Sequence, residues 1–112
     1  MKTKSIYEPK EEGDGVRVLI TRYYPRGVKK DRFDRWMRDL SPSRDLLRAY
    51  RSKEKSWDEL VAEFRAELDA NPAGQAALAE LRRDSRKGAV TLLCYERTGN
   101  PCHRKVVAEL IE

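Results

Sequence analysis

Two apolar segments that lie far apart in the sequence constrain the fold most. VRVLIT (residues 16–21) and AVTLLCY (89–95) are rich in β-branched residues and nearly uncharged, as strands buried on both faces of a sheet are. The chain between them carries helix signals, and a helical crossover is the usual connection between parallel strands. We therefore predict an α/β domain with a mostly parallel sheet covered by helices, in which TKSIY (3–7) forms a further short strand.

The helices are predicted from their start signals. Ser56 opens the sequence S-W-D-E, a capping box in which Ser56 and Glu59 satisfy each other's backbone N–H groups. Proline directly after a capping residue is typical of the first helical turn. This pair occurs at Ser41–Pro42, Asn71–Pro72 and Asn100–Pro101.

A further helix is predicted for residues 30–39. Phe33, Trp36 and Met37 follow helical spacing within this segment. The helix that starts at Ser41–Pro42 is then expected to run to about residue 50. The predicted order is strand, helices, strand, helix, which agrees with a helix-covered sheet.

The composition bounds the size and the location of the protein. A chain of 112 residues suits one domain, residues 1–112, without room for a separate catalytic module. No window is apolar enough for a signal peptide or a membrane-spanning helix, so we expect a cytoplasmic protein. In a reducing cytoplasm Cys94 and Cys102 are expected to be thiols, with Cys94 buried and structural.

The positive charge is concentrated in one segment. The net charge is +5, and residues 22–38 contain seven basic and two acidic residues, which equals that excess. Such a segment is typical either of a footprint for a polyanion or of an ordinary basic face. It lacks the aromatic interleaving of recognisable RNA-binding motifs. A nucleic-acid or protein interaction module that uses residues 22–38 is the alternative hypothesis for function, and a purely structural partner subunit is a third.

The last predicted helix places cations at an unfavourable end. TGNPCHRKVV (98–107) puts His103, Arg104 and Lys105 in the first turn, where each cation costs some tenths of a kcal/mol, up to about 1, against the helix dipole. At about 100° per residue, His103 falls in the middle of the apolar face, Arg104 flanks it and Lys105 points away. A bound anion would meet free backbone N–H groups there and offset the cost. We therefore predict an anion site at the start of this helix.

Other candidate residues follow the two strands. Arg22, Tyr24 and Arg26 come directly after the first strand, and Glu96 comes after the second. Ligands of open α/β sheets usually bind at this carboxyl edge, and two arginines there can grip a carboxylate or phosphate. Loop screening by the arginines and a simple Arg22–Glu96 ion pair are the structural alternatives.

The leading hypothesis is a small-molecule site for a phosphate- or carboxylate-bearing ligand, with the question of catalysis left open. The ligand-binding candidates are Arg22, Tyr24, Arg26, His103 and Arg104, and the catalytic candidates are Cys102, His103 and Glu96. Cys102 beside His103 at a helix N-terminus has the surroundings of a reactive thiol, and a partly buried inert thiol is the alternative.

Several sharper chemistries have no support in the sequence. Neither cysteine is followed by an arginine at the Cys-x5-Arg spacing of a phosphatase loop, which excludes a phosphatase of this type. A zinc site could use Cys94, Cys102, His103 and Glu96. Cys102 and His103 would diverge by about 100° on a helix, however, and there is no Cys-x2-Cys pair, so we predict no metal site. The glycine-rich dinucleotide and P-loop motifs and the hydrolase elbow are absent, so no cofactor is expected.

Three motifs in chain order carry a family resemblance. They are VRVLIT running into RYYPRG (16–27), W-x-x-D-L-S-P-S (36–43) and VTLLCYE followed by CHR (90–104). With these motifs over nearly its whole length, the chain resembles the bacterial and archaeal YeaO-like family, catalogued as domain of unknown function 488. It departs from the family pattern at Tyr24, where Trp is common, and at residues 48–50, where a Trp-Phe pair is frequent. The resemblance implies a small α/β domain with no established reaction.

Overall fold

A four-stranded sheet forms the centre of the structure, a computed structural model that describes residues 1–95 and 102–112. The strands are β1 (Lys2–Ser5), β2 (Val16–Leu19), β3 (Arg35–Trp36) and β4 (Val90–Cys94). They lie in the order β1-β4-β2-β3, and every neighbouring pair is parallel. The predicted α/β fold is confirmed, since β2 and β4 pair in parallel with Val18 opposite Leu92.

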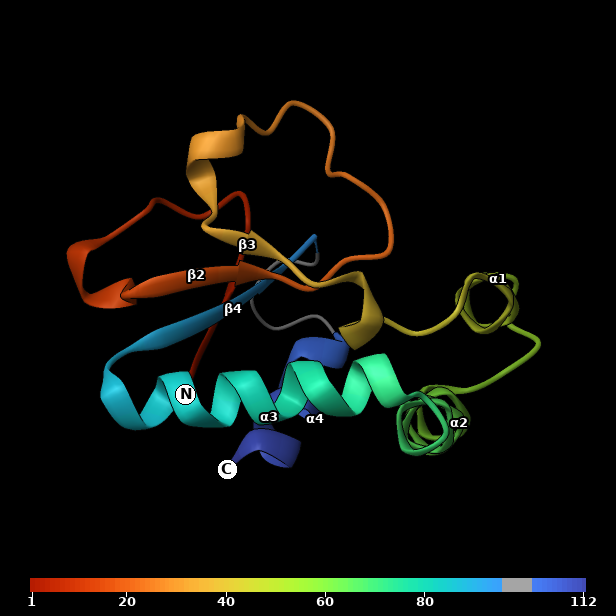
Figure 1. The fold of residues 1–112 in the computed structure, drawn as a ribbon. Helices are drawn as coiled ribbons and strands as arrows, with labels where there is room; N and C mark the ends of the chain where they lie inside the picture. The colour runs from red at the N-terminus through yellow and green to blue at the C-terminus, as the bar shows by residue number, and fades with distance from the viewer. Residues whose placement is uncertain (96–101) are drawn as a thin grey trace.

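Helices cover one face and one end of this sheet. They are α1 (Arg44–Arg51), α2 (Trp57–Asp69), α3 (Pro72–Lys87) and α4 (His103–Ile111), and short 3-10 turns lie at Glu12–Asp14, Lys30–Arg32 and Arg38–Leu40. α3 and α4 lie along one face, whereas α1 and α2 lie beyond the end of the sheet (Figure 1). Loops cover the opposite face. Within the described ranges, no helix combines the length and the apolar character needed to cross a membrane.

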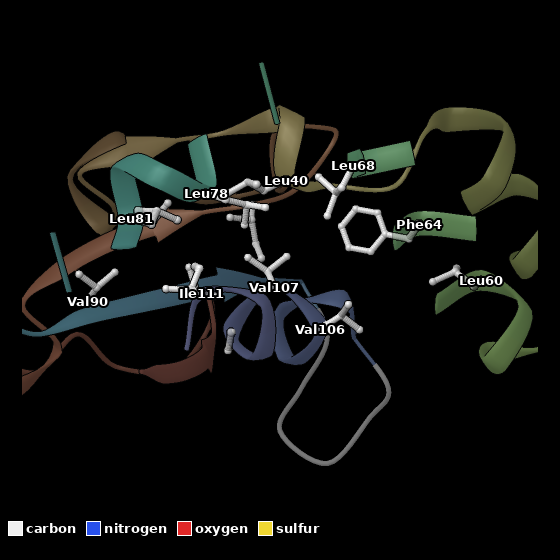
Figure 2. Close-up of a cluster of buried hydrophobic side chains, with 14 of the residues drawn as sticks. Leu40, Leu60, Phe64, Leu68, Leu78, Leu81, Val90, Val106, Val107 and Ile111 are labelled. Atoms are coloured by element: carbon white, nitrogen blue, oxygen red, sulfur yellow. The ribbon is translucent and has the colours of Figure 1, made fainter. Parts of the chain in front are cut away.

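Alternate residues of the strands face two separate cores, as the period of two in a strand requires. Val18 and Leu92 belong to the core on the helix-covered face. The helices contribute Leu60, Phe64, Leu68, Leu78, Leu81, Val106, Val107 and Ile111 to it (Figure 2). Leu19 and Leu93 instead join Ile6 in a smaller core on the loop-covered face.

The loop-covered face also contains a buried ion cluster that the sequence did not indicate. Asp14 is fully buried, and its carboxylate accepts hydrogen bonds from Lys4 Nζ at 3.1 Å and from Arg17 Nη1. Lys2 Nζ donates to the same carboxylate at 3.1 Å. Lys4 stands opposite Leu93 in the sheet, so strand alternation places both side chains on this face. The cluster attaches the turn before β2 to the sheet.

The predicted helix at residues 30–39 is wrong. The segment forms a 3-10 turn and then β3, whose flanking N–H groups donate two hydrogen bonds of 2.8 Å to carbonyls of β2. Phe33 and Trp36 pack against the core of the loop-covered face, whereas Met37 packs against the other core. Trp36 and Met37 therefore face opposite sides, as neighbours in a strand do, and pairing with β2 decides the conformation.

The predicted start of α1 is also wrong, by two residues. Ser43 is the N-cap, and its hydroxyl accepts from the Leu46 N–H at 3.2 Å. Ser41 instead ends the preceding turn, where its N–H donates to the Arg38 carbonyl at 3.0 Å. Pro42 consequently lies outside the helix.

The helix starts predicted at Ser56 and Asn71 are confirmed. Ser56 and Glu59 form the capping box at the start of α2, and Asn71 caps α3 with proline in its first turn. Asn100–Pro101 lies outside the described residues, and the described N-cap of α4 is Cys102. Local capping chemistry is therefore sufficient to place these starts.

We expect Ser56→Ala to lower the free energy of unfolding by about 1 kcal/mol. The substitution removes the hydroxyl that accepts from the Glu59 N–H at 3.2 Å. Urea denaturation measures the loss. Ser85→Ala is the control, because that exposed hydroxyl donates to the Arg82 carbonyl within α3, and its effect should stay within about 0.5 kcal/mol. Equal losses in both variants would contradict the capping role.

Candidate functional site

A pocket of about 80 Å³ lies at the carboxyl edge of the sheet, where β2 and β4 end and α4 begins. α1, α2 and the turn before them supply an apolar wall that consists of Pro42, Leu47, Tyr50, Trp57 and Leu60. The polar and sulfur-bearing residues that line the pocket are Thr21, Arg22, Ser41, Arg51, Cys94, Tyr95, Cys102 and His103. The carboxyl edge is therefore the place where the described chain gathers the residues best suited to chemistry.

Backbone carbonyls hold Arg22 at this pocket. Its Nη2 donates to the Ser41 carbonyl at 2.9 Å, and its Nε donates to the Pro42 carbonyl at 3.2 Å. Both carbonyls belong to the extended segment before α1, so the late start of α1 positions the guanidinium. The two bonds leave Nη1 without a hydrogen bond to any described residue.

His103 is buried at the inner end of the pocket, as its predicted inward direction requires. Its Nε2 lies 2.5 Å from the Ile20 carbonyl, and a carbonyl only accepts, so Nε2 carries the proton. Nδ1 is then the nitrogen with a free lone pair. Burial lowers the pKa of His103 to about 4, and the charges of Arg104 and Arg22 act in the same direction. The imidazole is therefore neutral near pH 7.

The two cysteines are bonded to each other, so the expectation of two thiols is wrong. A disulfide joins Cys94, at the end of β4, to Cys102, the N-cap of α4. The prediction rested on the compartment alone, whereas the fold brings the strand end and the helix start together. Cys94 is buried, as predicted.

Arg104, predicted to contact the ligand, is only 2% exposed and is not among the residues that line the pocket. Its Nη1 donates to Cys94 Sγ at 3.3 Å. The helical wheel gave its direction around α4 but not the packing of β4 against that side. This hydrogen bond directs the guanidinium of Arg104 to the end of β4.

The structure brings together three of the predicted site residues, Arg22, Cys102 and His103. Tyr24 and Arg26 do not line the pocket. Tyr24 packs edge-on against aromatic rings of the loop-covered face, and Arg26 is exposed on the loop after β2. Because the chain turns away directly after Arg22, these neighbours in sequence are separated in space.

Several pocket residues were missed from the sequence. Arg51 resembles an ordinary cation at a helix C-terminus, and Trp57 has the helical spacing of a core residue relative to Leu60 and Phe64. Tyr95 is the last residue of the predicted strand 89–95, and this place at the strand end was the one available signal. Glu96, the third catalytic candidate, lies outside the described residues.

The basic residues of segment 22–38 lie in different surroundings. Arg22 lines the pocket, and Arg35 forms an ion pair with Asp84 of α3. The guanidinium of Arg38 lies 4.0 Å above the centre of the Trp36 ring. The exposed basic residues of the segment are Arg26, Lys29, Lys30 and Arg38. The charge is therefore divided between the pocket, an ion pair and the surface.

The fold and the pocket define a small parallel α/β protein with arginines at the carboxyl edge of its sheet. A family model described as the active DUF488-N3 subclade matches residues 1–112, so the chain belongs to the DUF488 family. The predicted family resemblance is confirmed.

Relatives extend over nearly the whole chain. An uncharacterised protein of Mycobacterium tuberculosis is 34% identical over 108 residues, which cover 95% of this chain and 88% of the relative. The uncharacterised protein YeaO of Escherichia coli is 30% identical over 108 residues, which cover 95% of this chain and 91% of YeaO. No solved structure matches the chain significantly.

Proposed function

We propose that this protein binds a small organic anion, with a phosphate or carboxylate group, in the pocket at the carboxyl edge of its sheet. One observation carries the proposal: Arg22 and Arg51 line the pocket, and no Asp or Glu is among the described residues that line it. Charges in a partly enclosed site interact more strongly than charges in bulk water. Guanidinium groups also match carboxylate and phosphate through paired hydrogen bonds.

The arrangement of Arg22 and the N-terminus of α4 at the pocket supports this function. The Ser41 and Pro42 carbonyls orient Arg22 before any ligand arrives, which reduces the entropy lost on binding. The N-terminus of α4, with Cys102 and His103, also lies at the pocket. A helix N-terminus favours negative charge. Both features act on the same end of a ligand.

The apolar wall indicates that the ligand has an organic part. Tyr50 and Trp57 pack edge to face, with ring centres 5.6 Å apart, and both line the pocket. A cavity of about 80 Å³ holds several waters but not a nucleotide. The favoured ligands are therefore small acids or phosphate esters. We assign no reaction to the site.

We expect phenyl phosphate and benzoate to raise the thermal stability of the protein more than inorganic phosphate and acetate do. A ligand that binds only the folded state stabilises it by about 2.7 kcal/mol at a hundred times its Kd. The increment should shrink in Arg22→Ala and in Arg51→Ala, because each removes a cation of the pocket. Differential scanning fluorimetry over a ligand titration measures it.

Arg48→Ala is the matched control, because Arg48 is an exposed arginine of α1 that does not line this pocket. The control also removes the general effect of salts on apolar burial. Equal increments in all variants would contradict the proposed site.

The alternative, nucleic-acid binding through residues 22–38, predicts a steep fall of affinity with salt. We expect duplex DNA to bind no tighter than the non-specific range of about 10⁻⁴ to 10⁻⁶ M.

A further inference from the structure

Three atoms at the inner end of the pocket are of the kinds that bind zinc in proteins. The Sγ atoms of Cys94 and Cys102 and a ring nitrogen of His103 lie within 4.8 Å of one another, and all three residues are buried. Two thiolates and one imidazole are ligands that zinc prefers. The distance from Cys102 Sγ to His103 Nδ1 is 3.7 Å, close to the roughly 3.5–3.8 Å between ligand atoms around one tetrahedral zinc.

Cys102 does not adopt the helical geometry that, together with the missing Cys-x2-Cys pair, led to the prediction of no metal site. Cys102 is the N-cap of α4, with φ −151° and ψ 143°, so its backbone is extended. The divergence of about 100° between neighbours applies only within a helix. An extended residue directly before the first helical residue allows the side chains of Cys102 and His103 to converge.

The atoms around this set resemble the outer shell of a metal site. Nε2 of His103 donates to the Ile20 carbonyl, and ligating histidines almost always donate their second N–H in this way. This bond orients the ring and leaves Nδ1 as the ligand. Arg104 Nη1 donates to Cys94 Sγ at 3.3 Å, a contact that stabilises a thiolate. Ile20 and Arg104, which make these two contacts, are not among the residues that line the pocket.

We propose that, when the Cys94–Cys102 disulfide is reduced, Cys94, Cys102 and His103 bind one zinc ion whose fourth position is open to the pocket. A dithiol reductant supplies two electrons and two protons, the S–S bond breaks, and the reductant becomes a cyclic disulfide. Zinc then replaces the protons of the two thiols. The Cα atoms of the two cysteines are 7.5 Å apart, which leaves room for an ion between the separated sulfurs. This zinc binding does not depend on the anion proposal.

The test is a zinc titration of the full chain in its reduced and its oxidised form, against a competing chromophoric chelator. We expect the form reduced with dithiothreitol, after removal of the reductant without oxygen, to bind one zinc per chain, and the disulfide form to bind none. Cobalt in place of zinc should give thiolate charge-transfer absorption and the intense visible bands of a tetrahedral site. The chain contains two cysteines and one histidine, so both signals have one possible source.

Variants separate the ligands from their surroundings. C94S and C102S should each abolish the cobalt charge-transfer pattern of the pair, and H103Q should weaken zinc binding by more than the roughly 10- to 100-fold loss of an outer-shell partner. Lys105→Ala is the control, because Lys105 is exposed in the same turn, and its zinc affinity should be unchanged. Circular dichroism checks that each variant is folded.

Two results would overturn the proposal. One is zinc binding by the reduced protein no tighter than binding by the double variant C94S/C102S. The other is equal zinc binding by the reduced and disulfide forms. The second comparison uses only the natural chain, so a variant that fails to fold does not affect it.

Discussion

Asp14→Ala is expected to lower the free energy of unfolding by about 3–5 kcal/mol, because it leaves buried cations without their counterion. Asp14 and Arg17 are fully buried, and Lys4 is 6% exposed. Nη2 of Arg17 already has no hydrogen-bond partner among the described residues. Without the Asp14 carboxylate, Nη1 of Arg17 would lose its acceptor as well. Urea denaturation of the purified variant measures the loss.

Glu11→Ala is the matched control for this variant. Glu11 accepts from the same Lys4 Nζ at 2.9 Å, but its side chain is 66% exposed. Exposed ion pairs contribute about 0–1 kcal/mol, so Glu11→Ala should be nearly neutral in comparison. A loss in Asp14→Ala as small as that in Glu11→Ala would show that water replaces the carboxylate in the cluster.

The second large effect is a loss of stability in mild acid that depends on His103. Burial, with the charges of Arg104 and Arg22, lowers the pKa of His103 to about 4 in the folded protein, from 6.5. Between these two values the unfolded chain binds a proton that the folded chain does not. The contribution of neutral His103 to the free energy of unfolding is therefore fully present above pH 6.5. The free energy of unfolding falls by about 3 kcal/mol as the pH falls to about 4.

Chemical denaturation of the metal-free disulfide form at several pH values measures this slope. His103→Gln is the control, because glutamine retains a donor for the Ile20 carbonyl and does not titrate. Its stability should change much less between pH 7 and pH 4. An unchanged slope in this variant would assign the acid sensitivity to other groups.

Asp14 should act in a separate, more acidic range. Burial alone would raise the pKa of its carboxyl group, but hydrogen bonds from the Glu11 backbone and from Lys2, Lys4 and Arg17 outweigh burial and hold the pKa below its usual value of 3.8. Its contribution is complete above pH 3.8 and is lost as the pH falls further. The two groups therefore titrate in successive ranges.

Two helix starts with local signals were predicted correctly. The capping box at Ser56 and the Asn71–Pro72 pair act through residues a few positions apart, whereas the similar Ser41–Pro42 pair lies before α1, which starts after Ser43. The segment 30–39 has no such cap. Its apolar spacing suits a helix, but Trp36 and Met37 also alternate as in a strand, and hydrogen bonds to β2 select the strand.

The site was predicted in part, because some of its residues are marked by local sequence signals and others are not. Arg22 and His103 each lie at the end of a regular element, and the carboxyl edge of a parallel sheet gathers such ends. Arg51 and Trp57 reach the pocket only because α1 and α2 pack beyond that edge. No periodicity within either helix contains this information.

Sequence patterns alone predicted the parallel α/β order, the starts of α2 and α3 and the inward direction of His103, because crossover connections, capping pairs and the helical repeat are visible along the chain. The tertiary structure alone decided which side chains meet. Cys94 bonds to Cys102, and Asp14 is buried with Arg17, because packing sets the distances between elements. Those distances determine which groups are desolvated and which are paired, so the chemistry of the pocket follows from the fold.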